Sequence, residues 1–325
     1  MRALRRGPGP RPWQLEFALL TAVWGGSFLF IKVAVKHFAP VDVALGRVAL
    51  GAAVLLIALA VQRTRMPQGR EVWGHLFVVG LLGNAIPFTL LGYGEERISS
   101  VLAGIWNATT PLLTMLVAIA MLPDERPTPR RVAGLLAGFG GVIVVLGPWR
   151  SPGGSELLGQ LMCLGAAACY GIAFPYTRRF LAHRPDSGMA LSAGQLTCAS
   201  LQLAVATAFI GGAPHGVNSQ AVGSILALGV FGTGIAYILN YAVLRQAGAT
   251  TASTVTYVVP IWSTLLGVTV LGEGLTWNEP LGAAIVLTSV AVSQGLVNRA
   301  GRRERQHQRA QGEAVDHERA HRVRG

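Results

Sequence analysis

Two cationic side chains interrupt long apolar stretches near the amino terminus. Lys32 ends the segment WGGSFLFIK, and Arg47 lies within LGRVAL. If these stretches cross a bilayer, an ionisable group in the hydrocarbon region costs about 2.5–3.5 kcal/mol and is usually retained for a function. Each side chain is therefore a candidate for facing a cavity, attracting a carboxylate or phosphate, or gating the outer mouth. The alternative is that both extend to nearby headgroups, since Lys32 lies one turn before Lys36 and Arg47 follows Pro40.

Two prolines interrupt apolar segments at matching points of the chain. Pro111 follows NATT, and Pro260 follows TYVV. A proline inside a helix removes one backbone hydrogen bond and kinks the helix, and the carbonyl groups that it frees at mid-depth can bind a solute. We predict that both prolines are hinges, although proline is also tolerated in ordinary membrane helices.

Polar and aromatic residues gather around these prolines and in the neighbouring segments. Pockets for small molecules have mostly apolar walls and a few placed hydrogen-bonding groups, which is the composition seen here. The alternative is that each polar residue only forms an interhelical hydrogen bond, worth about 0.6 kcal/mol on average. The predicted substrate-binding residues are Trp24, Phe28, Lys32, Arg47, Asn84, Trp106, Asn107, Phe174, Tyr237, Asn240 and Tyr257.

The sequence contains no arrangement that predicts catalysis. It has no H-E-x-x-H or G-x-S-x-G motif, no phosphate-binding loop and no acidic pair within an apolar segment. The three cysteines form no C-x-x-C pair, so we expect neither a disulfide nor a metal site. Glu125 and Glu273 are predicted to cap helices or pair with Arg, and Glu95 is not predicted to be central. We predict a protein that is not an enzyme and has no cofactor and no metal.

The composition is that of an integral membrane protein. Hydrophobic residues make up 51% of the 325 residues, charged residues only 13%, and the mean hydropathy is +0.47. Soluble domains carry about a quarter charged residues. Because a span needs about 20 apolar residues and the runs do not alternate, we predict an all-α integral membrane fold of ten transmembrane helices. Their expected limits are 15–35, 41–61, 72–91, 99–122, 132–146 (a short span), 157–176, 189–210, 220–241, 250–271 and 281–297.

The Lys and Arg residues predict the orientation. With both termini cytoplasmic, the inner segments hold 22 of them and the outer segments only three: Lys36, Arg97 and Arg150. This bias places the protein in the cytoplasmic membrane as a multi-pass chain. The net charge of +12 lies in short loops and in a tail, so we expect no nucleic-acid partner. Residues 1–14 are predicted to be a basic cytoplasmic amino terminus, and residues 298–325 a basic, disordered cytoplasmic tail.

The chain contains an internal duplication. The glycine-rich stretch from Gly80 recurs from Gly229, and Pro111 then aligns with Pro260. WGGSFLFIK likewise aligns with YGIAFPYTR, which pairs Lys32 with Arg178. Because each copy holds five spans, the second copy is inverted relative to the first. We therefore predict two inverted five-helix repeats, at residues 15–147 and 157–297.

These motifs resemble the EamA-type branch of the drug/metabolite transporter superfamily. The resemblance rests on WGGSFLFIK, LGRVAL, NATTPLLTMLVAIAMLPDERPT and VVPIWSTLLGVTVLGEGLTWNEPLGAAIVL, in order and duplicated. It implies ten helices, cytoplasmic termini, a Lys and an Arg at matching positions, and export of a small metabolite. The chain departs from the family in MLPDERPT, where the family usually has a glycine before the Glu.

We therefore expect a secondary active transporter. It would export a small-molecule substrate, such as an amino-acid-like or drug-like solute, across the lipid bilayer by alternating access. A channel or scaffold, or a membrane enzyme without a recognisable motif, is the alternative. Gly134 and Gly138 form a small-xxx-small pair that fits packing inside the protomer, and a homodimer is also compatible with it.

Overall fold

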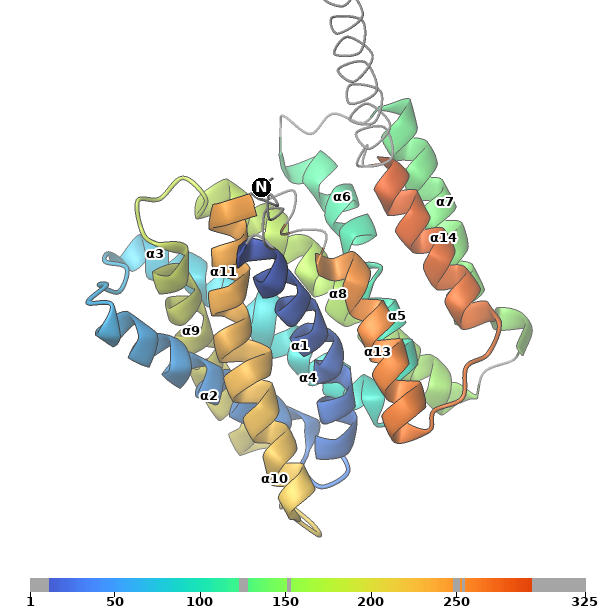
Figure 1. Cartoon of the computed structure of the whole chain (residues 1–325), viewed down its shortest axis with the longest axis horizontal. Helices are drawn as coiled ribbons and strands as arrows, with labels where there is room; N and C mark the ends of the chain where they lie inside the picture. Colours follow the sequence, from blue (N-terminus) through green and yellow to red (C-terminus); the bar gives the residue numbers. More distant parts are fainter. Residues whose placement is uncertain (1–11, 123–127, 151–152, 248–251, 253–254, 294–325) are drawn as a thin grey trace, which may run out of the picture.

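The computed structural model describes residues 12–122, 128–150, 153–247, 252 and 255–293, and Figure 1 shows the chain as a bundle of helices. The predicted tail 298–325, most of the predicted amino-terminal segment and Glu125 lie outside these residues. Within them the structure is helical and has no strand. The first repeat consists of α1 (Pro12–Ala34), α2 (Pro40–Val61), α3 (Arg70–Gly80), η1 (Leu81–Ala85), α4 (Ile86–Glu95), α5 (Ser100–Asn107), α6 (Thr110–Met121) and α7 (Pro129–Leu146). After the connector η2 (Pro148–Arg150), the second consists of α8 (Gly154–Phe180), α9 (Gly188–Ile210), α10 (Ser219–Leu226), η3 (Ala227–Ile235), α11 (Ala236–Ala247), α13 (Val255–Leu271) and α14 (Asn278–Ser293).

The predicted set of ten spans is confirmed. Eight helical stretches are long and apolar enough to cross a membrane, and α13 and α14 are shorter apolar helices. Two details differ from expectation. The third, sixth and eighth spans are longer than predicted, since they run from Arg70 to Glu95, from Gly154 to Phe180 and from Ser219 to Ala247. The fifth span, predicted to be short, has 18 residues in α7.

We call the end at which α1 begins the N-face and the end at which α1 finishes the far face. The spans alternate, so α1 runs from the N-face to the far face while α8, its counterpart in the second repeat, runs the opposite way. Gly159 of α8 packs against Arg97 and Ile98, which follow α4 at the far face. The repeats are therefore inverted, as predicted.

Matching glycines bring matching helices together in the two repeats. A Cβ on Gly25 of α1 would overlap Trp262 of α13, and a Cβ on Gly171 of α8 would lie 2.9 Å from Cβ of Leu113 in α6. Gly25 aligns with Gly171 and Leu113 with Trp262 in the duplication. The same helix pair thus meets at the same point in both halves, since only glycine permits this approach.

A π-helical segment stands at the same place in each repeat. η1 interrupts the third span, and η3 interrupts the eighth at the aligned position. Such segments occur frequently at functional sites because they widen the helix and re-aim its side chains. In the fourth span the helix breaks between α5 and α6, next to Pro111, whereas α13 continues through Pro260. The two predicted hinges therefore sit in different local structures.

The last helix of each repeat stands apart from the others. Figure 1 shows α7 and α14 side by side at one edge of the bundle, away from α2, α3 and α9. Gly141 of α7 approaches Val286 of α14, and Gly138 approaches Leu112 of α6. The other eight spans form the body of the bundle, and their residues line a cavity.

Candidate substrate-binding site

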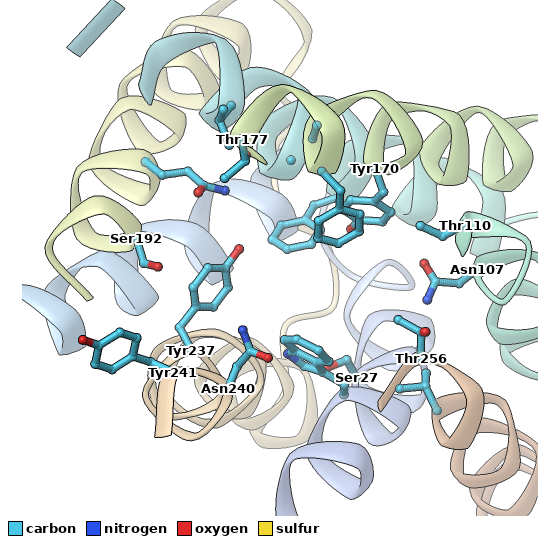
Figure 2. Close-up of a pocket in the computed structure, with 18 of the residues that line it drawn as sticks. Ser27, Asn107, Thr110, Tyr170, Thr177, Ser192, Tyr237, Asn240, Tyr241 and Thr256 are labelled. Atoms are coloured by element: carbon cyan, nitrogen blue, oxygen red, sulfur yellow. The ribbon is translucent and has the colours of Figure 1, made fainter. Parts of the chain in front are cut away.

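A cavity of about 430 Å³ lies within the body formed by the two repeats. Its size falls in the range of about 300–1,000 Å³ that is typical of small-molecule pockets. Figure 2 shows the hydrogen-bonding side chains of Asn107, Tyr237 and Asn240 around the same open space. The aromatic wall consists of Trp24, Phe28, Phe88, Tyr170 and Phe174, and the further polar lining of Ser27, Thr110, Thr177, Ser192, Gln195, Tyr241 and Thr256.

The cavity extends toward the N-face and ends before the far face. Ile31 and Leu91, each one turn before the far end of its helix, form the closed end. In the opposite direction the lining continues to Leu181, Gly188 and Leu244, where α8 and α11 end and α9 begins. Leu244 at this end is 41% exposed, whereas Ile31 and Leu91 at the other end are each 3% exposed.

Arg47 lines the cavity toward its closed end. Its Nε donates to Oγ1 of Thr233 at 3.0 Å, and its Nη2 donates to the carbonyl oxygen of Gly232 at 3.4 Å. The guanidinium carbon also stands 3.9 Å from the centre of the Phe88 ring, a cation–π contact. The side chain is buried, with 6% of its surface exposed. The π-helical turn sets this geometry, because Thr233 Oγ1 itself donates to the carbonyl of Leu228, five residues back.

Gln195 is the counterpart of Arg47 in the second repeat. The alignment pairs Gly46-Arg47 with Gly194-Gln195 and Thr233 of η3 with Asn84 of η1. Gln195 Nε2 donates to Oδ1 of Asn84 at 2.6 Å, just as Arg47 donates to Thr233. Asn84 Nδ2 donates in turn to the hydroxyl of Tyr237, the counterpart of Phe88. The two repeats thus present equivalent polar clusters, one with a guanidinium and one with a neutral amide.

Lys32 closes the far face instead of lining the cavity. Its Nζ donates to the carbonyl oxygens of Glu95 and Ile98, the latter at 2.7 Å. The Glu95 carbonyl lies in the last turn of α4 and the Ile98 carbonyl just beyond it, where the helix dipole favours a cation. The contact ties the end of α1 to the loop between α4 and α5, one residue beyond Ile31 at the closed end of the cavity.

Glu273 strengthens the same closure from the second repeat. Its carboxylate accepts the backbone N–H groups of Ser100 and Val101 at 2.9 and 3.0 Å and the Ser100 hydroxyl at 2.8 Å. The chain is turned for this by Gly272, whose φ of +66° lets the N–H of Glu273 bond back to Gly267 at the end of α13. The predicted capping role of Glu273 is therefore confirmed, although the capped helix is α5 of the other repeat.

A buried carboxylate that we did not expect to be central lies beside this closure. Glu95 has no exposed surface, and neither of its carboxylate oxygens has a hydrogen-bond partner among the described residues. Lys32, Glu273, Arg47 and Cys163 are the titratable groups that face it.

The cavity brings together seven of the eleven predicted binding residues: Trp24, Phe28, Arg47, Asn107, Phe174, Tyr237 and Asn240. The other four lie elsewhere. Lys32 is at the far face, and Asn84 is buried behind Tyr237. Trp106 is buried and donates to Gln160 at 3.3 Å, and Tyr257 packs on the cluster that contains Leu112. Their assignment to substrate stays a prediction.

Several cavity residues were missed by sequence reasoning. Gln195 could have been found, because the duplication aligns it with Arg47. Phe88 could have been found as the counterpart of Tyr237 in the same way. Tyr170 could have been found as well, because the duplication aligns it with Trp24. No comparable signal distinguishes Ser192 or Thr177 from ordinary helix residues.

Comparison with known sequences identifies the family. The sequence model of the EamA-like transporter family matches residues 12–147 and again residues 157–294. The chain belongs to this family. The resemblance noted from the motifs is thereby confirmed, and the two matches coincide with the two repeats.

Curated relatives align with this chain over most of their length. A protein of Archaeoglobus fulgidus described as an uncharacterized transporter is 24% identical over 86% of this chain and 97% of its own. The uncharacterized transporter YoaV of Bacillus subtilis is 26% identical, over 83% of this chain and 92% of its own. Protein PagO of Salmonella typhimurium is 28% identical, over 85% and 92%.

A solved crystal structure shares the fold. It superimposes with a TM-score of 0.63 and 22% sequence identity, over 89% of this chain and 98% of that chain. The family match, the relatives and the apolar spans together identify this chain as a multi-pass membrane transporter.

Proposed function

We propose that this EamA-family protein is a secondary active transporter that exports a small metabolite across the cytoplasmic membrane by alternating access. The observation that carries the proposal is a cavity between two inverted repeats whose lining continues to the N-face but stops one turn short of the far face. Inverted repeats can exchange conformations, so that the open and closed faces exchange as well. The closure by Lys32 and Glu273 would open in the alternate state.

The orientation supports export. The positive-inside rule assigns the N-face to the cytoplasm, since the loops there are rich in arginine while Lys36, Arg97 and Arg150 mark the far face. In this assignment the cavity is open to the cytoplasm and receives solute from the cell. A static pore would need a path through the far face, which Lys32 and Glu273 obstruct.

Two measurements test the proposal. Untargeted metabolite analysis of the medium, from cells with and without the protein, should reveal one solute class that accumulates outside only when the protein is present. The purified protein in proteoliposomes should then show saturable counterflow of that solute. Flux that rises linearly with concentration and shows no counterflow would indicate a pore and contradict alternating access.

A further inference from the structure

The cavity wall carries one charge. Among its 26 lining residues, all within the described chain, Arg47 is the only Asp, Glu, Lys or Arg. The guanidinium is cationic at any physiological pH. The cavity wall therefore carries one positive charge and no negative one, toward the end formed by Ile31 and Leu91.

Arg47 has hydrogen-bond donors to spare. A guanidinium carries five N–H groups, and the contacts to Thr233 and Gly232 use one on Nε and one on Nη2. No carboxylate of the described residues lies within ion-pair distance of it. The remaining donors, both on Nη1 and one on Nη2, suit the two oxygens of a carboxylate.

The second repeat shows that the charge is not needed for the scaffold. Gln195 occupies the equivalent position and makes the equivalent bond to η1 with a neutral side chain. Burying a charge in a membrane protein costs free energy that a glutamine would avoid. A ligand that pairs with the guanidinium supplies a reason for the arginine that packing does not.

The nearest buried carboxylate, that of Glu95, is not the anionic partner of Arg47. Glu95 forms no ion pair with Arg47 and does not line the cavity, whose wall ends one turn earlier at Leu91. The electrostatic interaction of Glu95 with Lys32 is stronger than its interaction with Arg47. Lys32, Glu273 and Cys163 also face Glu95, so it belongs to the far-face closure.

We propose that the solute is a small organic monocarboxylate, held by its carboxylate on Arg47 at the closed end of the cavity. The aromatic wall around Trp24, Phe28 and Phe174 receives the apolar part of the molecule. Tyr237 and Asn240 are placed to bond a further polar group (Figure 2). This inference rests on the proposed transport function and names the substrate class of the same cavity.

Three probes of similar size test the substrate class. Phenylacetate, phenylacetamide and 2-phenylethylamine share one body and carry a negative, a neutral and a positive head. Calorimetry on the full chain in lipid nanodiscs should give phenylacetate an affinity about tenfold or more above that of the amide, with the amine weakest. Equal affinities, or a preference for the amide or the amine, would overturn the proposal.

The variant R47Q is the matched test, because it installs the residue that the second repeat uses. It should lose the preference for phenylacetate over phenylacetamide while amide affinity stays within about twofold. The control R70Q removes an exposed arginine at the start of α3 and should keep the full preference. A preference that survives in R47Q overturns the assignment to Arg47.

A second variant, R47K, keeps the proposal testable if R47Q folds poorly. R47K keeps the charge but lacks the planar fork, so phenylacetate should bind about three- to tenfold more weakly, still ahead of the amide. Unchanged phenylacetate affinity in R47K would place the carboxylate elsewhere. Transport is measured separately: counterflow of a solute that is not a carboxylate would reject the substrate class and leave the transporter intact. Carboxylate binding without counterflow would reject the transporter and leave the site intact.

Discussion

The two repeats share their close contacts and differ in their charges. Gly25 and Gly171 permit the same helix approach in both halves, and Gly80 and Gly229 do so again, the former against the carbonyl of Gln195 and the latter against that of Arg47. The half-buried Lys32, by contrast, aligns with the exposed Arg178.

The same divergence affects the other buried charges. Arg47 aligns with the neutral Gln195, and the buried Glu95 aligns with Leu244. The duplicated glycines maintain a backbone that both halves need, whereas the charged positions were free to specialise. Among the described residues, the buried charges are Arg47 and Glu95 in the first repeat and Glu279 in the second, at positions that do not match. Experiments that exchange or remove charged residues therefore test the comparison directly.

The largest effect is expected from Lys32→Met. The substitution removes two hydrogen bonds from a charged donor, each worth about 1.5–3 kcal/mol, and leaves Glu95 without its nearest cation. We expect counterflow of the exported solute to fall at least about tenfold, because the far face no longer closes. Lys36→Met, one turn further along and exposed, is the control. Equal transport by the two variants would show that the contact is incidental.

Alanine at the paired glycines tests whether the repeats are equivalent in packing. G25A would force a Cβ to within 2.9 Å of the carbonyl oxygen of Val259, and G171A would place one 2.9 Å from Leu113. Overpacking of this kind costs about 1–3 kcal/mol, so both variants should melt several degrees lower. G140A is the control, since a Cβ at Gly140 meets nothing within 4 Å. The packing equivalence fails if only one member of the pair is sensitive.

Glu273→Gln should have a smaller effect than Lys32→Met. Glutamine keeps one oxygen for the N–H groups of Ser100 and Val101 but removes the charge that favours a helix amino terminus, worth about 1 kcal/mol. We expect about a fivefold loss of counterflow with normal abundance in the membrane. Glu71→Gln, whose side chain is 83% exposed, should transport normally. If Glu273→Gln matched this control, the closure would depend on Lys32 alone.

Sequence reasoning succeeded where it could use length, periodicity and duplication. Ten spans, their order and their inversion follow from apolar runs of sufficient length, which the bilayer requires of any helix. Positions that matter through the backbone, such as Gly25 and Gly171, were also visible, because both copies keep them.

Sequence reasoning was weaker for side chains whose role depends on how their helix is rotated about its axis. Arg47 and Lys32 looked alike in the sequence, yet one lines the cavity and the other bonds to carbonyls at the far face. Tyr257 lies next to cavity residue Thr256 but packs on the cluster of Leu112. A helix that is apolar nearly all round carries no periodic signal to decide its rotation. Glu95 was overlooked for the same reason, because a residue at the end of a span can be either buried or exposed.

The smallest expected effect tests how the Arg47 cluster differs from its neutral counterpart. Thr233→Val removes the hydroxyl that accepts from Arg47 Nε and leaves the contacts to Gly232 and Phe88. Phenylacetate should bind about threefold more weakly, because the guanidinium is less firmly oriented, while phenylacetamide is unaffected. Thr269→Val is the matched control, since its hydroxyl also bonds back to a helix carbonyl but lies exposed on α13. An equal loss for both probes would mean that Thr233 supports the shape of η3 and not the direction of the charge.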